Sequence, residues 1–280
     1  MALVNAGTLR GYYHMARESE PDAEKSYGRA HRAVLGVLGA GVFGLLDAND
    51  RLIERSNHGG HEVWDTGEWP WIARFEERTD DLRAEYENFA RCHVIPQVAE
   101  VAGLDPSRGE GAAAAPVDAG VWRAQPVFAG GRWFKGVAEH FPVLRSCFDG
   151  ATPASTVGFS VLGPSSHIAP HSDPNRGALR FQLPLMVPGS PSQCRTRIGS
   201  QTVGCVEGSA TVFDISREHE AWNESDGWRV LLMAEIREPL RPPLSTVNWL
   251  AQKSLRWHPS YRHLGERVSE LSDRTGAPLS

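Results

Sequence analysis

The feature that most constrains the fold of this 280-residue chain is a series of short apolar segments that starts at residue 156. These segments are rich in Val, Ile, Phe, Leu and Thr, and clusters of Gly, Pro, Ser and Asp separate them. They read TVGFSVLG, ALRFQLPLMV, QCRTRIG, QTVGCVEG, ATVFDIS and WRVLLMAEI. Closely spaced strands of this kind are typical of an all-β sandwich or barrel.

The rest of the chain predicts helices and loops around this β core. In residues 69–104 large apolar side chains recur close to the helical period, whereas residues 1–55 indicate a mixed helical and loop region. Residues 107–120 predict a surface loop, and residues 265–272 a short helix. We expect a mainly β core with flanking helices, in one structural domain. Its parts are an N-terminal region packed on the core (1–120), the core (121–240) and a tail (241–280).

Composition and charge exclude several classes of protein. The formal net charge of −5 offers no basic excess for nucleic acid, and four Cys are too few for a disulfide scaffold. The longest apolar run, residues 34–46, is broken by glycines and is shorter than the roughly 20 residues that a membrane span needs. No secretory signal is evident at the start. We therefore expect a cytoplasmic protein with a small-molecule substrate, no nucleic-acid partner and no membrane partner, and its oligomeric state is left open.

The pattern that most resembles a chemical site is His171-Ser172-Asp173 followed by His219. On an extended segment residues two apart share a face, so His171 and Asp173 can address one metal ion and a facing strand can add His219. Two imidazoles and one carboxylate form the facial triad of non-haem Fe(II) oxygenases. The triplet alone also fits a surface turn, because the following residues are rich in turn formers.

Two arginines strengthen the metal interpretation. In the strand ALRFQLPL, period two places Leu179, Phe181 and Leu183 on one face and Arg180 and Gln182 on the other. Polar residues inside such a strand are explained by a barrel that encloses a charged small molecule. Arg229, ten residues after His219, offers a fork for a carboxylate, although alone it also fits a paired arginine at the barrel rim.

Over residues 156–239 the chain resembles the aspartyl/asparaginyl β-hydroxylase family. The motifs PHxD, LRFxLPL, FDxSxxHEAWN and an arginine ten residues after the histidine occur in the expected order. A thinner resemblance extends upstream, and residues 1–55 are not clearly covered. The resemblance implies a double-stranded β-helix of the jelly-roll, cupin-like type. It also implies an Fe(II)- and 2-oxoglutarate-dependent dioxygenase, with O2 as co-substrate and ascorbate as reductant in vitro.

Position by position, the resemblance implies His171 and His219 as iron ligands, and Asp173 as the third ligand in branches of the family with a full triad. Ser160 and Arg229 are implied to hold the distal carboxylate of 2-oxoglutarate. Two further residues are implied to lie near the carboxylate that chelates iron, namely Arg180 and Gln182.

Three positions depart from the pattern of many asparaginyl hydroxylases. Asp173 stands where those proteins have Gly, which favours a full triad and disfavours halogenation. Gln182 stands where His is common. Ala178 replaces a second arginine that helps to bind the acidic substrate, which weakens the case for a peptidyl Asp or Asn substrate.

Together these features predict an enzyme that hydroxylates an unactivated C–H bond while 2-oxoglutarate is decarboxylated to succinate. The expected substrate is an amino acid or an amino-acid-derived small molecule, free or carrier-bound, with Arg176 as a weak candidate to contact it. Two alternatives stay open. The same iron site can carry out desaturation, cyclisation or epimerisation, or the barrel can be a non-catalytic cupin-like binder of a small ligand.

Neighbouring residues have simpler interpretations. Glu220 adjoins His219 on a strand, so its side chain should point the other way. Cys194 and Cys205 flank a predicted hairpin turn and are expected to be buried thiols.

Overall fold

The computed structural model describes residues 23–56, 61–102, 117–148, 154–173, 175–257 and 264–274. In these residues twelve strands form two sheets, and every neighbouring pair is antiparallel. The larger sheet has the order β1 (Val63–Trp64), β10 (Thr211–Asp214), β7 (Ala178–Met186), β12 (Arg229–Arg237), β5 (Ala154–Leu162), β3 (Trp122–Ala129) and β4 (Arg132–Trp133). The smaller has the order β2 (Val117–Ala119), β6 (Ser166–His171), β11 (His219–Asn223), β8 (Cys194–Ile198) and β9 (Gln201–Gly204).

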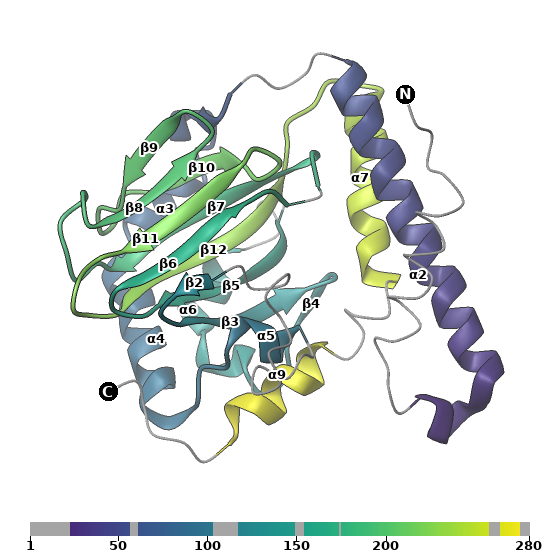
Figure 1. The fold of residues 1–280 in the computed structure, drawn as a ribbon, viewed down its shortest axis with the longest axis horizontal. Coiled ribbons are helices and arrows are strands. Elements are labelled where there is room, and N and C mark those ends of the chain that lie inside the picture. The colour runs from purple at the N-terminus through teal and green to yellow at the C-terminus, as the bar shows by residue number, and fades with distance from the viewer. Residues whose placement is uncertain are drawn as a thin grey trace.

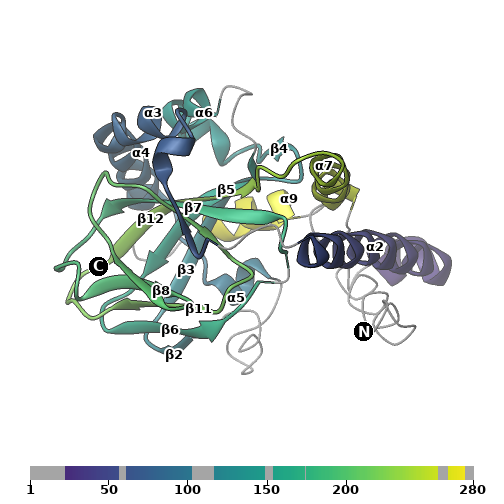
Figure 2. The same ribbon diagram turned by 90° about the horizontal axis from the view of Figure 1, so that it is seen from above.

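The chain passes back and forth between the two sheets. From β5 to β8 each successive strand lies in the other sheet, and β10, β11 and β12 alternate in the same way. The two sheets face one another (Figures 1 and 2). This is the double-stranded β-helix, or jelly roll, that the sequence predicts, with helices around it.

The helices lie on the outside of the larger sheet and beside it. They are α2 (Ala23–Arg55), α3 (Ile72–Glu76), α4 (Thr79–Cys92), α5 (Val98–Val101), α6 (Pro142–Cys147), α7 (Leu244–Ser254) and α9 (Leu264–Ser272). Short 3-10 helices are η1 (Thr66–Glu68), η3 (Ala138–His140) and η4 (Leu255–Trp257). In Figures 1 and 2, α3, α4 and α6 cover the sheet, and α2 and α7 lie side by side next to the barrel.

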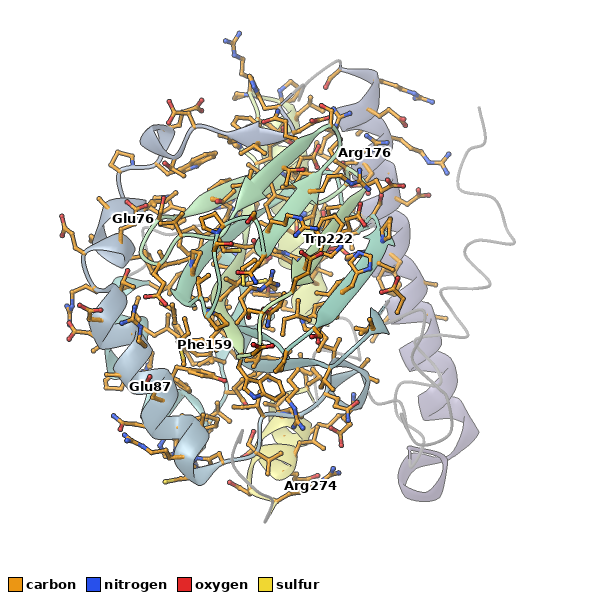
Figure 3. All side chains as sticks on the ribbon, turned by 60° about the vertical axis from the view of Figure 1, so that its left-hand side comes forward. Glu76, Glu87, Phe159, Arg176, Trp222 and Arg274 are labelled. Atoms are coloured by element: carbon orange, nitrogen blue, oxygen red, sulfur yellow. The ribbon has the colours of Figure 1, made fainter. Side chains whose placement is uncertain are left out.

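The main core lies between the larger sheet and these helices. Leu179, Phe181 and Leu183 are fully buried there, as period two in β7 predicts. The aromatic ring of Phe159 on β5 lies 5.1 Å from that of Tyr86 on α4, measured between centroids (Figure 3). Because this face is filled with apolar side chains, the alternate residues of the same strands must point into the barrel.

In the described part of the N-terminal region α2 runs as one helix through the Gly-rich apolar run, whereas residues 1–22 of the expected mixed helix and loop lie outside the described residues. Val42 and Leu46 are buried against Ala251 and Leu255, so packing outweighs the low helix propensity of glycine. The helix predicted near the C-terminus is α9. Most of the loop predicted at 107–120 lies outside the described residues. Within the described chain, no helix combines the length and apolarity needed to cross a membrane.

Candidate active site

Two imidazoles meet inside the barrel, one from each of two paired strands of the smaller sheet. His171 ends β6 and His219 begins β11, and the two residues are register partners. Their ring centroids lie 4.2 Å apart. Each Nδ1 lies 2.9 Å from a backbone carbonyl oxygen, that of Ala169 for His171 and that of Arg217 for His219. A carbonyl oxygen only accepts, so both Nδ1 atoms carry the proton and both Nε2 lone pairs remain free to bind a metal.

The electrostatic environment keeps His219 neutral. Burial lowers its pKa to about 4, and the neighbouring His171 and Arg180 act in the same direction. Its Nε2 atom is buried and has no hydrogen-bond partner in the described structure. A buried, neutral imidazole with an unused lone pair is the form that binds a metal ion.

Asp173, the expected third ligand, follows β6 and is held by two contacts. Its backbone N–H donates to the carbonyl oxygen of Ile215 at 2.9 Å, and its Oδ2 accepts from Nη2 of Arg180 at 2.8 Å. Among the described residues, no three His, Cys, Asp or Glu side chains are grouped closely enough to form a metal site. The structure thus brings the two histidines together and pairs the carboxylate with Arg180.

Arg180 forms ion pairs with two carboxylates. The same Nη2 atom lies 3.0 Å from Oε1 of Glu235 on the neighbouring strand β12, where the two residues are register partners. Burial acts to lower the pKa of Arg180, but Asp173 and Glu235 outweigh it and the pKa is raised. The guanidinium is therefore charged, and protein carboxylates already neutralise it.

Arg229, at the start of β12, has a different environment. Its side chain is 1% exposed, its Nη1 donates to the carbonyl oxygen of Trp222 at 3.1 Å, and its Nε atom has no partner. Within the described residues no carboxylate pairs with it. Burial lowers its pKa, although not enough to remove the charge of an arginine at neutral pH. A buried guanidinium without a counter-ion is costly, so this position fits an anionic ligand.

Ser160 lies on the same side of the sheet as Arg229. Arg229 pairs with Leu162 and Leu231 pairs with Ser160, so all four side chains share the inner face. The Oγ atom of Ser160 is buried and accepts a hydrogen bond from Nε1 of Trp122 at 2.9 Å. Because that lone pair is taken, the hydroxyl hydrogen of Ser160 remains available to donate to an anion.

Gln182 and Arg176 complete the predicted set. Gln182 shares the inner face with Arg180, and its Nε2 lies 3.5 Å from Sδ of Met233. Arg176 lies after β6 near α2, where its Nη2 is 3.4 Å from Oε1 of Glu54 and its side chain is 41% exposed (Figure 3). Its role toward a substrate stays a prediction.

The residues given simpler interpretations lie where the sequence places them. Glu220 points away from His219 and forms an ion pair with Arg197 on the outer face of the smaller sheet. Cys194 and Cys205 are free, buried thiols on either side of the β8–β9 hairpin.

Residues 76–239 match the sequence profile of the family described as aspartyl/asparaginyl β-hydroxylase. That match spans more than half of the chain and includes both histidines, Asp173 and the two inner arginines. The chain belongs to the aspartyl/asparaginyl β-hydroxylase family.

Curated relatives carry hydroxylase names. An ornithine lipid ester-linked acyl 2-hydroxylase from Rhizobium tropici is 29% identical over 192 residues, 68% of this chain and 66% of that protein. The human aspartyl/asparaginyl β-hydroxylase is 30% identical over 105 residues, 38% of this chain and 13% of that protein. The chain thus spans about two thirds of the bacterial relative and about an eighth of the human one. This membership supports an enzyme with hydroxylase activity.

Solved cupin domains are also similar in structure. One is the cupin domain of a transcriptional regulator from Enterobacter cloacae, with 11% identity and a TM-score of 0.29, covering 42% of this chain and 97% of that domain. Another is a cupin conserved barrel domain protein from Salinispora arenicola, with 11% identity and a TM-score of 0.28, covering 45% of this chain and 83% of that one.

Reasoning from the sequence missed Glu235 and Trp122. Glu235 lies six residues after Arg229, and period two along β12 places both on the inner face. The alternation of this strand could therefore have identified Glu235 from the sequence. Trp122 gave no such signal, because its contact with Ser160 depends on the pairing of β3 with β5.

Proposed function

We propose that this chain is an Fe(II)- and 2-oxoglutarate-dependent dioxygenase that hydroxylates an unactivated C–H bond of an amino acid or amino-acid-derived small molecule, free or carrier-bound. The observation that carries the proposal is the pairing of two neighbouring imidazoles with a buried arginine that no described carboxylate neutralises, inside one barrel. The imidazoles suit a metal ion, and the arginine suits the carboxylate of an anionic co-substrate.

The donor set fits iron. His171 and His219 both present Nε2 lone pairs from facing strands, and the Nε2 atom of His219 is a buried polar atom without a partner. Asp173, two residues after His171, would supply the carboxylate of the facial triad. The backbone carbonyls that accept from each Nδ1 fix the ring tautomers and would raise the basicity of the ligands. When bound, iron supplies the activation of O2 that no protein side chain provides.

The other inner residues would bind and orient 2-oxoglutarate. Arg229 can donate two parallel hydrogen bonds to a carboxylate, and the hydroxyl of Ser160 can donate a third from the same face of the sheet. Arg180 is already paired with Asp173 and Glu235, so it is the weaker attraction for a second anion. The co-substrate should therefore place its distal carboxylate at Arg229, and its buried position would exclude water from that end.

The substrate class is proposed from chemistry and from relatives together. The human relative is named for aspartyl and asparaginyl residues, and the relative from Rhizobium tropici for an ornithine lipid, so both names include an amino acid. Ala178 has no charge with which to bind an acidic side chain, which favours substrates other than peptidyl Asp or Asn. The same site could also lead to desaturation, cyclisation or epimerisation, and product analysis distinguishes these outcomes.

The proposal is tested by succinate formation from 2-oxoglutarate in air, with Fe(II) and ascorbate and no added substrate. Wild-type protein should show slow, iron-dependent turnover, and the His219→Ala variant should show none. Glu220→Ala is the matched control, because it alters the adjacent residue on the outer face. If wild-type protein binds neither iron nor 2-oxoglutarate, the chain is a non-catalytic barrel and the proposal fails.

A further inference from the structure

A cavity of about 470 Å3 lies between the inner side of the larger sheet and the helices beside it. This volume is within the range of small-molecule sites, about 300–1,000 Å3. Its walls come from β3, β5 and β12 on one side and from α2, α5, η4 and α9 on the other, and most of the side chains are apolar. Examples from the helical wall are Phe43, Val98, Val101, Leu255 and Leu264.

One end of this cavity adjoins the candidate iron site. Arg180 and Glu235 line it, and the same Arg180 nitrogen that contacts Glu235 also contacts Asp173. Arg229 and Ser160 do not line the cavity, so it is separate from the pocket assigned above to 2-oxoglutarate. A molecule in this space would therefore lie beside Arg180, which contacts Asp173, and would leave the pocket assigned to the co-substrate open.

The two arginines at the cavity differ in whether protein carboxylates neutralise them. The guanidinium of Arg180 is paired with two carboxylates, whereas Arg267 on α9 donates from Nη1 to the carbonyl oxygen of Val101 at 3.3 Å. Within the described residues Arg267 pairs with no carboxylate. Arg267 is thus the cation at the cavity that is free to attract an anionic group, and the space between it and Arg180 is apolar.

We propose that this cavity is the substrate site, and that it takes an amphiphilic amino-acid derivative with an unbranched apolar chain whose anionic group binds Arg267. The assignment to substrate rests on the proposed function, whereas the binding chemistry does not. The alkyl chain of the ligand would extend along the apolar walls toward Arg180. Carbons remote from the anionic group would then lie close to the proposed iron ligands. At about 30 Å3 per heavy atom, the volume of one water in the liquid, the cavity has room for about fifteen heavy atoms, enough for a ten-carbon chain with its head group.

Part of the helical wall comes from segments outside the match to the family profile. Phe43, Leu255, Leu264 and Arg267 all lie outside residues 76–239, the part that matches the family profile. The chemistry of the barrel is thus combined with a wall made from segments beyond that match. We assign to this wall the choice of substrate.

The test measures binding by calorimetry to the full chain without iron or 2-oxoglutarate. The probes are decanoate, decanol and decylamine, which share one chain and differ in head group. Decanoate should bind at least about tenfold more tightly than decanol, because a hydrogen bond to a charged group is worth about 1.5–3 kcal/mol. Decylamine should bind most weakly. The variant Arg267→Gln should reduce decanoate binding to the level of decanol and leave decanol unchanged.

Two bulky variants test the location. Val101→Trp places a large side chain in the cavity wall and should weaken all three probes by about tenfold or more, with thermal unfolding measured to show that the protein is folded. Val206→Trp is the matched control, since Val206 lies on an exposed loop away from the cavity and should bind like wild type.

Absence of binding by any probe overturns the proposal, as does equal binding of decanoate and decylamine or insensitivity to both Val101→Trp and Arg267→Gln. These outcomes leave succinate formation unaffected, so the cavity can be wrong while the iron chemistry is right. Conversely, decanoate binding that depends on Arg267, in a protein that binds neither iron nor 2-oxoglutarate, supports the amphiphile site and refutes the proposed function.

Discussion

Replacing Arg229 by an apolar residue should stabilise the protein and strongly weaken binding of its proposed co-substrate. The guanidinium is 1% exposed, contacts one backbone carbonyl and the thiol of Cys205, and has no carboxylate partner within the described chain. Replacing it with methionine, Arg229→Met, keeps an elongated side chain of similar volume and removes the charge. The loss of a buried, uncompensated charge should favour folding.

The magnitude follows from these contacts. Replacing buried ionic groups by well-packed apolar ones commonly stabilises a protein by about 1–4 kcal/mol. The lost hydrogen bond to Trp222 offsets about 1 kcal/mol, which leaves a gain of about 2 kcal/mol. For a domain of this size that gain raises Tm by about 4–8 °C. Removing one partner of a buried, hydrogen-bonded charge pair costs about 2–5 kcal/mol, so 2-oxoglutarate should bind about 30-fold to several thousand-fold more weakly.

The assay is thermal unfolding under nitrogen, with and without 2-oxoglutarate. At a ligand concentration of about 100 times Kd, wild-type protein should gain about 2.7 kcal/mol of stability. Arg229→Met should start from a higher Tm and gain at most about 0.9 kcal/mol at the same concentration. Arg195→Met is the matched control, because Arg195 pairs with Glu224 on the outer face of the smaller sheet. It should lose at most about 1 kcal/mol and keep the full shift with 2-oxoglutarate.

Two results would refute the reasoning. A fall in Tm of the unliganded Arg229→Met protein would mean that the arginine is compensated in solution. A thermal shift with 2-oxoglutarate equal to that of wild type would mean that the co-substrate places its carboxylate elsewhere, with Arg180 as the next candidate.

Three further predictions concern the neighbouring strands. Glu235→Gln should remove one of the two carboxylates that pair with Arg180 and so strengthen the remaining ion pair with Asp173. Mn2+ binding should weaken about tenfold or more, as measured by titration followed by electron paramagnetic resonance. Burial raises the pKa of Glu238 to about 7 from its ordinary value of 4.5, so the folded state binds the proton more tightly than the unfolded state. Its contribution to stability should therefore fall by up to about 3 kcal/mol as pH rises from 4.5 to 7. Urea unfolding across that range should show this contribution as a pH-dependent difference between wild type and Glu238→Gln, because the lowered pKa of His219 changes the stability of both proteins in the opposite direction. Phe181→Ala should cost about 3–5 kcal/mol in the same measurement, because its ring is fully buried against the helices.

Local patterns in the sequence determine much of the barrel. The alternation in β7 and β12 predicts which residues face the helices and which face inward, because period two is a geometric property of every strand. The motifs around His171 and His219 predict the family, which the profile match confirms. The continuous helix α2 was not predicted, because its glycines are poor helix formers and its contacts with α7 come from the other end of the chain.

Contacts between distant segments account for what the sequence could not provide. Glu235 contacts Arg180 because β12 pairs with β7, and Trp122 contacts Ser160 because β3 pairs with β5. The cavity near Arg267 needs four helical segments to meet the sheet, and no periodicity encodes such a meeting. Candidate ligands can therefore be found by spacing and motif, whereas the partners that set their charge require the three-dimensional structure.

The two inner arginines differ in whether protein carboxylates balance their charge, and this difference would separate the binding sites of two different anions. Arg180 has its charge balanced by Asp173 and Glu235, so a second carboxylate gains little there, whereas Arg229 has no counter-ion and gains the most from one. Under the proposals above, the co-substrate would be directed to Arg229, and an anionic substrate would be directed to Arg267 at the cavity. Because the region near Arg180 is neutralised, it could then accept an uncharged carbon chain beside the proposed metal ligands, which is where a C–H bond has to lie for hydroxylation.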